Sequence, residues 1–115
     1  MPGVAMGKRK AMPPEVAEAV LARSAGTCEA MIPGVCVGRA HHLHHRKMRS
    51  QGGEHTEENL VALCHQCHSY AHHNPAWSYE RGLLIRGRDE VTWPPRYYRG
   101  VYRKEEEDGE RMHRS

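Results

Sequence analysis

The stretch that decides the fold runs from His44 to His68 and reads HHRKMRSQGGEHTEENLVALCHQCH. It ends in Cys64-x-x-Cys67, a spacing that lets one tight turn present both sulfurs to a single ion. In the middle, Gly52-Gly53 indicates a surface loop that reaches to Asn59, and the apolar run 60–63 is typical of a short buried strand. The stretch therefore predicts a loop, a strand and a metal-binding knuckle in that order.

The composition limits how such a chain can fold. It has 115 residues, which is enough for one small domain, and it contains no Phe, 38% hydrophobic residues and 27% charged residues. A chain this poor in apolar side chains cannot build a large core, so we expect a metal or a disulfide framework to stabilise it. The net charge of +3 is compatible with phosphate binding but does not establish it.

The four cysteines can be interpreted as two disulfides or as one metal site. Residues 1–14 lack the apolar run of a secretion signal, and no later segment approaches a membrane span, so we expect a reduced, cytoplasmic chain. Thiolates bind zinc well under those conditions. The sequence therefore predicts a closed, structural Zn²⁺ site formed by Cys28, Cys36, Cys64 and Cys67.

The segments around this stretch predict an α+β class. Pro13-Pro14 begins a helix that Gly26 ends, the loop 28–36 turns at Pro33-Gly34, and residues 39–46 run extended. After the knuckle we expect a helix that stops before Asn74-Pro75, with Asn74 as the N-cap of a further short helix. That helix should end at Gly82, with residues 83–85 as a strand-like exit.

The expected domain organisation has three parts. Residues 1–12 are predicted to be a flexible basic arm, residues 13–100 the folded domain with its motif core at 28–73, and residues 101–115 a charged flexible tail. Aromatic side chains near the C-terminal end of the domain could stack on bases, but core packing is the more ordinary role in a domain this short of apolar residues.

Histidine supplies the second group of candidate ligands. His68 and His72 are four residues apart, so a helix would present both to one metal ion. The spacing alone is weak evidence, because a chain with ten histidines is expected to contain such a pair by chance. The neighbouring motifs make the pattern specific.

Residues 28–73 closely resemble the HNH endonuclease family. The features that match, in order, are a histidine pair, a Gly-Gly loop, an Asn-Leu, a Leu-Cys-x-x-Cys-His and a later helical histidine. The resemblance implies the ββα-metal fold of that family, in which two short antiparallel strands and a helix hold one divalent cation. The four cysteines would add a structural zinc knuckle, and short helices would flank the unit.

The resemblance also implies roles for individual residues. His45 matches the general base, His44 the neighbouring metal ligand, and Asn59 the residue that braces the loop and orients the base. His68 and His72 match two further ligands of the same divalent ion, which would be Mg²⁺, Mn²⁺, Ni²⁺ or Zn²⁺. The basic side chains after the base, Arg46, Lys47 and Arg49, are candidates for contacts with the phosphates that flank the cleaved bond.

Two geometric questions stay open at this point. His41-His42 is a rival pair, although only His44-His45 places its second histidine seven residues before Gly52, as the family spacing requires. A regular strand would also put His44 and His45 on opposite faces, so the pair should lie where the strand opens into the loop.

The predicted function is cleavage of DNA, as nicks or double-strand cuts, by a monomer with no membrane partner. Small proteins with this layout resemble those encoded beside phage packaging genes, which suggests a role with a terminase and portal in a bacterial host. The alternative is a zinc-knuckle module that binds DNA or assembles with partners without catalysis. His45 favours the enzyme, because a binding module has no need of it.

Overall fold

A hairpin of two short strands organises the chain, whose computed structural model describes residues 11–103. Strand β1 (His42–His45) pairs antiparallel with β2 (Leu60–Leu63) in a register that places His44 opposite Val61 and His45 opposite Leu60. Paired residues point to the same side of a sheet and successive residues to opposite sides. His44 and His45 therefore project from opposite faces of the hairpin, at the end where β1 enters the 46–59 loop.

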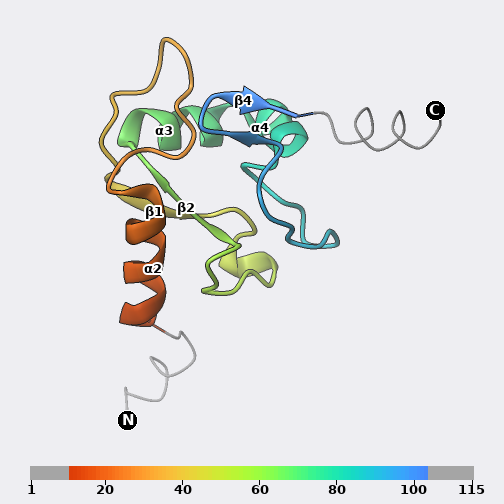
Figure 1. Ribbon diagram of the computed structural model, residues 1–115. Coiled ribbons are helices and arrows are strands. Elements are labelled where there is room, and N and C mark those ends of the chain that lie inside the picture. Colours follow the sequence, from red (N-terminus) through yellow and green to blue (C-terminus); the bar gives the residue numbers. More distant parts are fainter. Residues whose placement is uncertain (1–10, 104–115) are drawn as a thin grey trace, which may run out of the picture.

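Both faces of the hairpin are covered, which explains why β2 is apolar and buried throughout. On one face Val61 and Leu63 pack with the buried cysteines and Leu83, next to helix α3 (His65–His73). On the other face Leu60 and Ala62 pack against Val20 of helix α2 (Pro14–Ser24). Figure 1 shows the hairpin between these two helices. The predicted strand at 60–63 is confirmed.

The helix ends follow the turn chemistry of the sequence, with one exception. Helix α2 begins at Pro14 and ends where Ala25 and Gly26 adopt left-handed backbone angles. Helix α4 (Pro75–Arg81) ends at Gly82, also left-handed. The prediction that Asn74 is the N-cap of α4 is confirmed, but its side chain makes no cap bond: the side-chain amide donates to the Tyr70 carbonyl at 2.9 Å, at the end of α3.

The C-terminal part of the domain differs from the expectation. Residues 83–85 are buried but form no strand, because their backbone bonds go to Ser78 and Arg46 rather than to a ladder. Strands β3 (Tyr97–Tyr98) and β4 (Val101–Tyr102) then pair around a turn at Arg99 and Gly100. The prediction that the flexible tail begins at residue 101 is therefore wrong for residues 101 and 102, which form β4.

The predicted arm and tail lie largely outside the described residues, which exclude 1–10 and 104–115. Within residues 11–103, no helix combines the length and the apolar character needed to cross a membrane. Tyr97 is a member of the main core cluster, and Trp77 and Trp93 pack against it, so these aromatic side chains serve the core.

A buried carboxylate ties the layers together. Glu29 is 1% exposed and accepts hydrogen bonds from Arg23 of α2 at 2.7 and 2.8 Å, from the Ala62 amide of β2 at 2.9 Å, and from the Tyr98 hydroxyl. A buried charge is tolerated when several donors surround it. This network fixes α2, β2 and β3 relative to one another and so holds the hairpin in place.

Candidate active site

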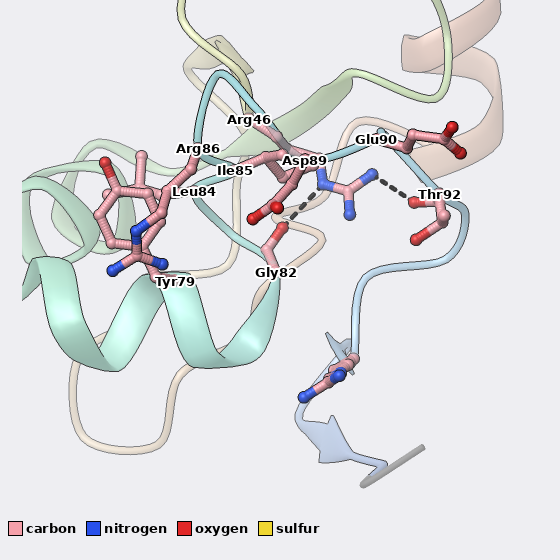
Figure 2. Close-up of a pocket in the computed structure, with 10 residues that line it drawn as sticks. Arg46, Tyr79, Gly82, Leu84, Ile85, Arg86, Asp89, Glu90 and Thr92 are labelled. Carbon is pink, nitrogen blue, oxygen red and sulfur yellow. Dashed lines mark hydrogen bonds between the residues drawn. The ribbon is translucent and has the colours of Figure 1, made fainter. Parts of the chain in front are cut away.

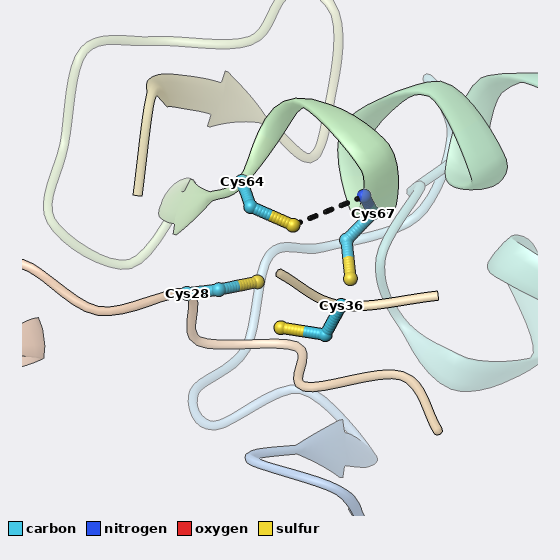
Figure 3. Close-up of side chains that lie close together, drawn as sticks. All are labelled: Cys28, Cys36, Cys64 and Cys67. Atoms are coloured by element: carbon cyan, nitrogen blue, oxygen red, sulfur yellow. Dashed lines mark hydrogen bonds between the residues drawn. The ribbon is translucent and has the colours of Figure 1, made fainter. Parts of the chain in front are cut away.

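The four cysteines converge although two of them lie far from the others in the sequence. The sulfurs of Cys28, Cys36, Cys64 and Cys67 all lie within 4.8 Å of one another, and no disulfide joins them. Figure 3 shows Cys64 and Cys67 at the start of α3 facing Cys28 and Cys36 from the N-terminal loop. Sulfurs that share a tetrahedral zinc ion lie ~3.8 Å apart, given Zn–S bonds of ~2.3 Å. The donor set and its spacing fit that ion.

Backbone amides point at the sulfurs. Cys64 Sγ accepts from the Cys67 amide at 3.3 Å and from the Val37 amide at 3.5 Å, and Cys36 Sγ accepts from the Gly38 amide at 3.3 Å. Such donors stabilise negative charge on sulfur. A hydrogen bond between Cys28 and Cys67 lowers the pKa of the Cys28 thiol and raises the pKa of the Cys67 thiol, so this buried pair shares one proton. The cluster is thus prepared for a cation.

Three histidines form a second, separate cluster. Nitrogens of His44, His68 and His72 lie within 4.8 Å of one another, with His44 supplied by β1 and the other two by successive turns of α3. His44 is 2% exposed, whereas His72 is exposed. The cluster is therefore closed on the side of the core and open towards solvent. His41 and His42 take no part in it.

A carbonyl group determines which nitrogen of His44 can bind a metal. Nε2 of His44 lies 2.7 Å from the Leu83 carbonyl oxygen, which can only accept a hydrogen bond. Nε2 must therefore carry the proton, and in the neutral ring the lone pair is then on Nδ1. A backbone partner of this kind is what orients histidine ligands in metal sites.

Burial keeps two of these ligands, His44 and His68, neutral. It lowers the pKa of His44 to about 3 and that of His68 to about 4, with the neighbouring histidines adding to the effect. Neutral imidazole is the form that binds metal, so ligation here requires no proton to be displaced at neutral pH.

The same shift predicts a dependence of stability on pH. As pH falls below ~6.5 the unfolded chain takes up a proton at residue 44, and the folded chain does not until pH approaches 3. The stability that neutral His44 contributes is thus present above pH ~6.5 and is lost as the pH falls. We therefore compare wild type, with no metal bound at the histidines, with His44→Leu. Between about pH 6 and 4, wild type should lose ~1.4 kcal/mol more unfolding free energy per pH unit than the variant. Urea denaturation at stepped pH measures this; equal slopes for the two proteins would contradict it.

His45 points away from this cluster, towards the 46–59 loop. Its Nε2 lies 3.0 Å from Nδ1 of His55, with the ring centroids 5.1 Å apart. Burial lowers the pKa of His45, and the charges of His55 and Arg49 lower it further. His45 is therefore a neutral imidazole at physiological pH, as a general base must be.

Asn59 braces the loop that follows His45. Its side-chain oxygen accepts from the Lys47 amide at 2.7 Å, and its amide nitrogen donates to the carbonyls of Lys47 and Glu54, both at 3.0 Å. Asn59 is 1% exposed, and its bonds reach the backbone rather than the His45 imidazole. Gly53 packs so tightly here that a Cβ would lie 1.8 Å from the Lys47 carbonyl oxygen. The loop therefore requires glycine at position 53.

The prediction that Arg46 contacts phosphates is wrong. Arg46 is 2% exposed and donates to the carbonyls of Gly82 and Thr92, both at 2.8 Å, and of Glu58 at 2.6 Å. Figure 2 shows the bonds to Gly82 and Thr92. Burial lowers its pKa to about 10, and the side chain is an internal brace between the loop and the C-terminal segment. The two basic side chains that follow are more accessible than Arg46: Arg49 is exposed and Lys47 is half-buried.

The structure adds two groups that the sequence pattern did not identify, the Leu83 carbonyl beside His44 and the His55 ring beside His45. It also stacks the ring of His42, a member of the rival pair, on His68 at 4.5 Å between centroids. A carbonyl leaves no sequence signal. His55 lies in the loop at no recognisable spacing, so only its position between motif residues could have drawn attention to it.

Comparison with known proteins identifies one family. Residues 27–74 match the model of the family described as HNH endonuclease. No curated protein and no solved structure matches the chain. The matched segment contains the four cysteines, the three clustered histidines, His45 and Asn59. Residues 27–74 therefore resemble the HNH endonuclease domain, whose family consists of nucleases that act on nucleic acids, and the four clustered cysteines are consistent with its zinc-binding subtype.

Proposed function

We propose that this chain is a metal-dependent endonuclease that hydrolyses phosphodiester bonds in DNA. The observation that carries the proposal is the convergence of His44, His68 and His72 at the end of β1, where the next residue in the sequence is a neutral His45. Ligands from a strand and a helix, with a candidate base on the adjacent residue, meet the needs of phosphodiester hydrolysis better than those of simple binding.

The histidine cluster would hold one divalent cation. Its donor set fits, because three imidazoles meet on a face that stays open at His72. Imidazole donors favour Zn²⁺ and Ni²⁺ by affinity, and Mn²⁺ and Mg²⁺ are further candidates. When bound, the ion would stabilise negative charge on a non-bridging phosphate oxygen and on the leaving 3′ oxygen.

His45 would act as the general base. It takes a proton from a water molecule, whose oxygen forms a bond to phosphorus as the bond between phosphorus and the 3′ oxygen breaks. The leaving oxygen then acquires a proton from solvent. Asn59 contributes by fixing the backbone on both sides of the loop, and Arg49 and Lys47 would contact neighbouring phosphates.

The cysteine cluster would bind a structural zinc ion. Four thiolates complete a tetrahedral shell and leave no position for substrate, so its role would be folding. It would join the N-terminal loop to the start of α3 and thereby hold His68 in place one residue after Cys67. Reduced thiols imply the cytoplasm, for a phage protein that of the bacterial host, where the nuclease could act as a monomer or assist a terminase.

The test is cleavage of supercoiled plasmid by the purified zinc-loaded chain in buffers that contain Mg²⁺, Mn²⁺, Ni²⁺ or additional Zn²⁺. We expect nicked or linear product in at least one of them, and the ratio of the two reports single-strand against double-strand cutting. Retarded migration of DNA without cleavage in every metal would instead support a zinc-knuckle binding module.

A further inference from the structure

We propose that His55 is a positioning residue for the reaction, which holds the His45 ring in the tautomer that leaves Nδ1 free to accept a proton. The inference rests on the proposed nuclease function. It is carried by a contact that is not among the matched features of the motif: His45 at the end of β1 faces His55 of the 46–59 loop, with His45 Nε2 3.0 Å from His55 Nδ1.

The geometry of this contact is that of a directed hydrogen bond. The ring planes are tilted by 56° with their centroids 5.1 Å apart, so the rings meet through their nitrogens rather than stack. Both side chains are half-buried. In this environment the hydrogen bond between them competes less with water than it would at an exposed site.

The loop is built to hold the two histidines together. Asn59 bonds to Lys47, two residues after His45, and to Glu54, one residue before His55. The backbone N–H of Asn59 also donates to the Thr56 carbonyl at 3.1 Å, and this bond closes the turn that follows His55. A single buried asparagine therefore fixes the backbone beside both rings. This explains how Asn59 can influence His45 without contacting its imidazole.

The hydrogen bond selects one tautomer of His45. A neutral imidazole has one N–H and one lone pair on its two nitrogens. If Nε2 donates to His55, the lone pair is on Nδ1 and can take the proton of a water molecule. If Nε2 accepts instead, Nδ1 carries hydrogen and His45 cannot act as a base through that atom. His55 would thus act on His45 as a triad carboxylate acts on its histidine, by orientation and tautomer.

The experiment compares wild type, His55→Ala, His55→Asn and the control His73→Ala, all as full chains with both metals bound. His73 is an exposed histidine whose ring contacts Ser69. On a fluorescent DNA duplex, His55→Ala should lower kcat by about 10–100-fold, the usual effect of removing an outer partner, with little change in KM. His55→Asn should regain most of the lost rate, because its amide oxygen can accept at the position of Nδ1. His73→Ala should match wild type.

A second measurement does not depend on activity. Nitrogen-15 NMR of the imidazole rings should show His45 protonated at Nε2 in wild type and in His55→Asn, and a mixture of tautomers in His55→Ala. A wild-type His45 protonated at Nδ1, or a kcat for His55→Ala equal to that of wild type, would overturn the proposal. If wild type cleaves no DNA, the proposed function fails and the NMR result alone decides the role of His55. If His55→Ala does not fold, the wild-type and His55→Asn spectra decide it.

Discussion

Replacing His45 with alanine is expected to lower the rate of DNA cleavage by about 10²–10⁴-fold, the usual contribution of a general base. The residue is half-buried, neutral at physiological pH and adjacent to the metal-ligand candidate His44, yet it is absent from the cluster that would hold the ion. Its loss should therefore remove proton transfer and leave metal binding intact. Initial rates of plasmid cleavage at saturating metal, for wild type and His45→Ala, measure the effect.

The matched control is His41→Ala. His41 is exposed, precedes β1 by one residue and stacks on His65 outside the histidine cluster. In the rival register His41 and His42 would be the ligand and the base, so His41→Ala would abolish cleavage, whereas in the register of the structure it should cleave like wild type. Zinc content and a melting curve show that each variant is folded. Equal cleavage by His45→Ala and wild type would exclude His45 as the base.

Local signals predict the loop, the strand and the closely spaced members of each cluster, whereas the cysteine count and the family resemblance added Cys28, Cys36 and His44 to them. Gly52-Gly53 indicates a loop and residues 60–63 an apolar strand, and the Cys-x-x-Cys spacing needs a single turn to work. The distance from His45 to Gly52 favours His44-His45 over His41-His42. The structure brings nitrogens of His44, His68 and His72 together, with His44 as the member from that pair. Here short-range pattern and tertiary structure agree.

The errors arise where a side chain satisfies distant partners. Arg46 looks like a phosphate ligand in sequence because it is basic and follows the base. In the fold it lies under the loop, where three carbonyls that belong to residues 58, 82 and 92 need a donor. Nothing near position 46 in the sequence records those carbonyls. The same holds for the Leu83 oxygen that sets the tautomer of His44 and for the ring of His55.

Removing one cysteine ligand is expected to unfold the domain. Cys36 is the best position to test, because Cys28, Cys64 and Cys67 are 0% exposed and their replacement would also leave a cavity, whereas Cys36 is half-buried. Structural zinc contributes about 10–16 kcal/mol to folding in zinc-finger peptides at neutral pH, and a small domain has only about 5–15 kcal/mol of net stability. Cys36→Ala should therefore lose both its bound zinc and its cooperative melting transition.

The control and the chemistry of the site make this result specific. Val37→Ala changes a neighbouring side chain that is 55% exposed and should leave zinc content and melting temperature close to wild type. A chelator should unfold wild type as the substitution does, while a reductant should have no effect, because the fold depends on four free thiols rather than on disulfides. Melting that a reductant lowers, or a Cys36→Ala protein that keeps its zinc and its transition, would contradict the structural zinc site. Since His68 directly follows Cys67, loss of zinc should also abolish cleavage by disordering the start of α3, even though the cysteines form a cluster separate from the histidines.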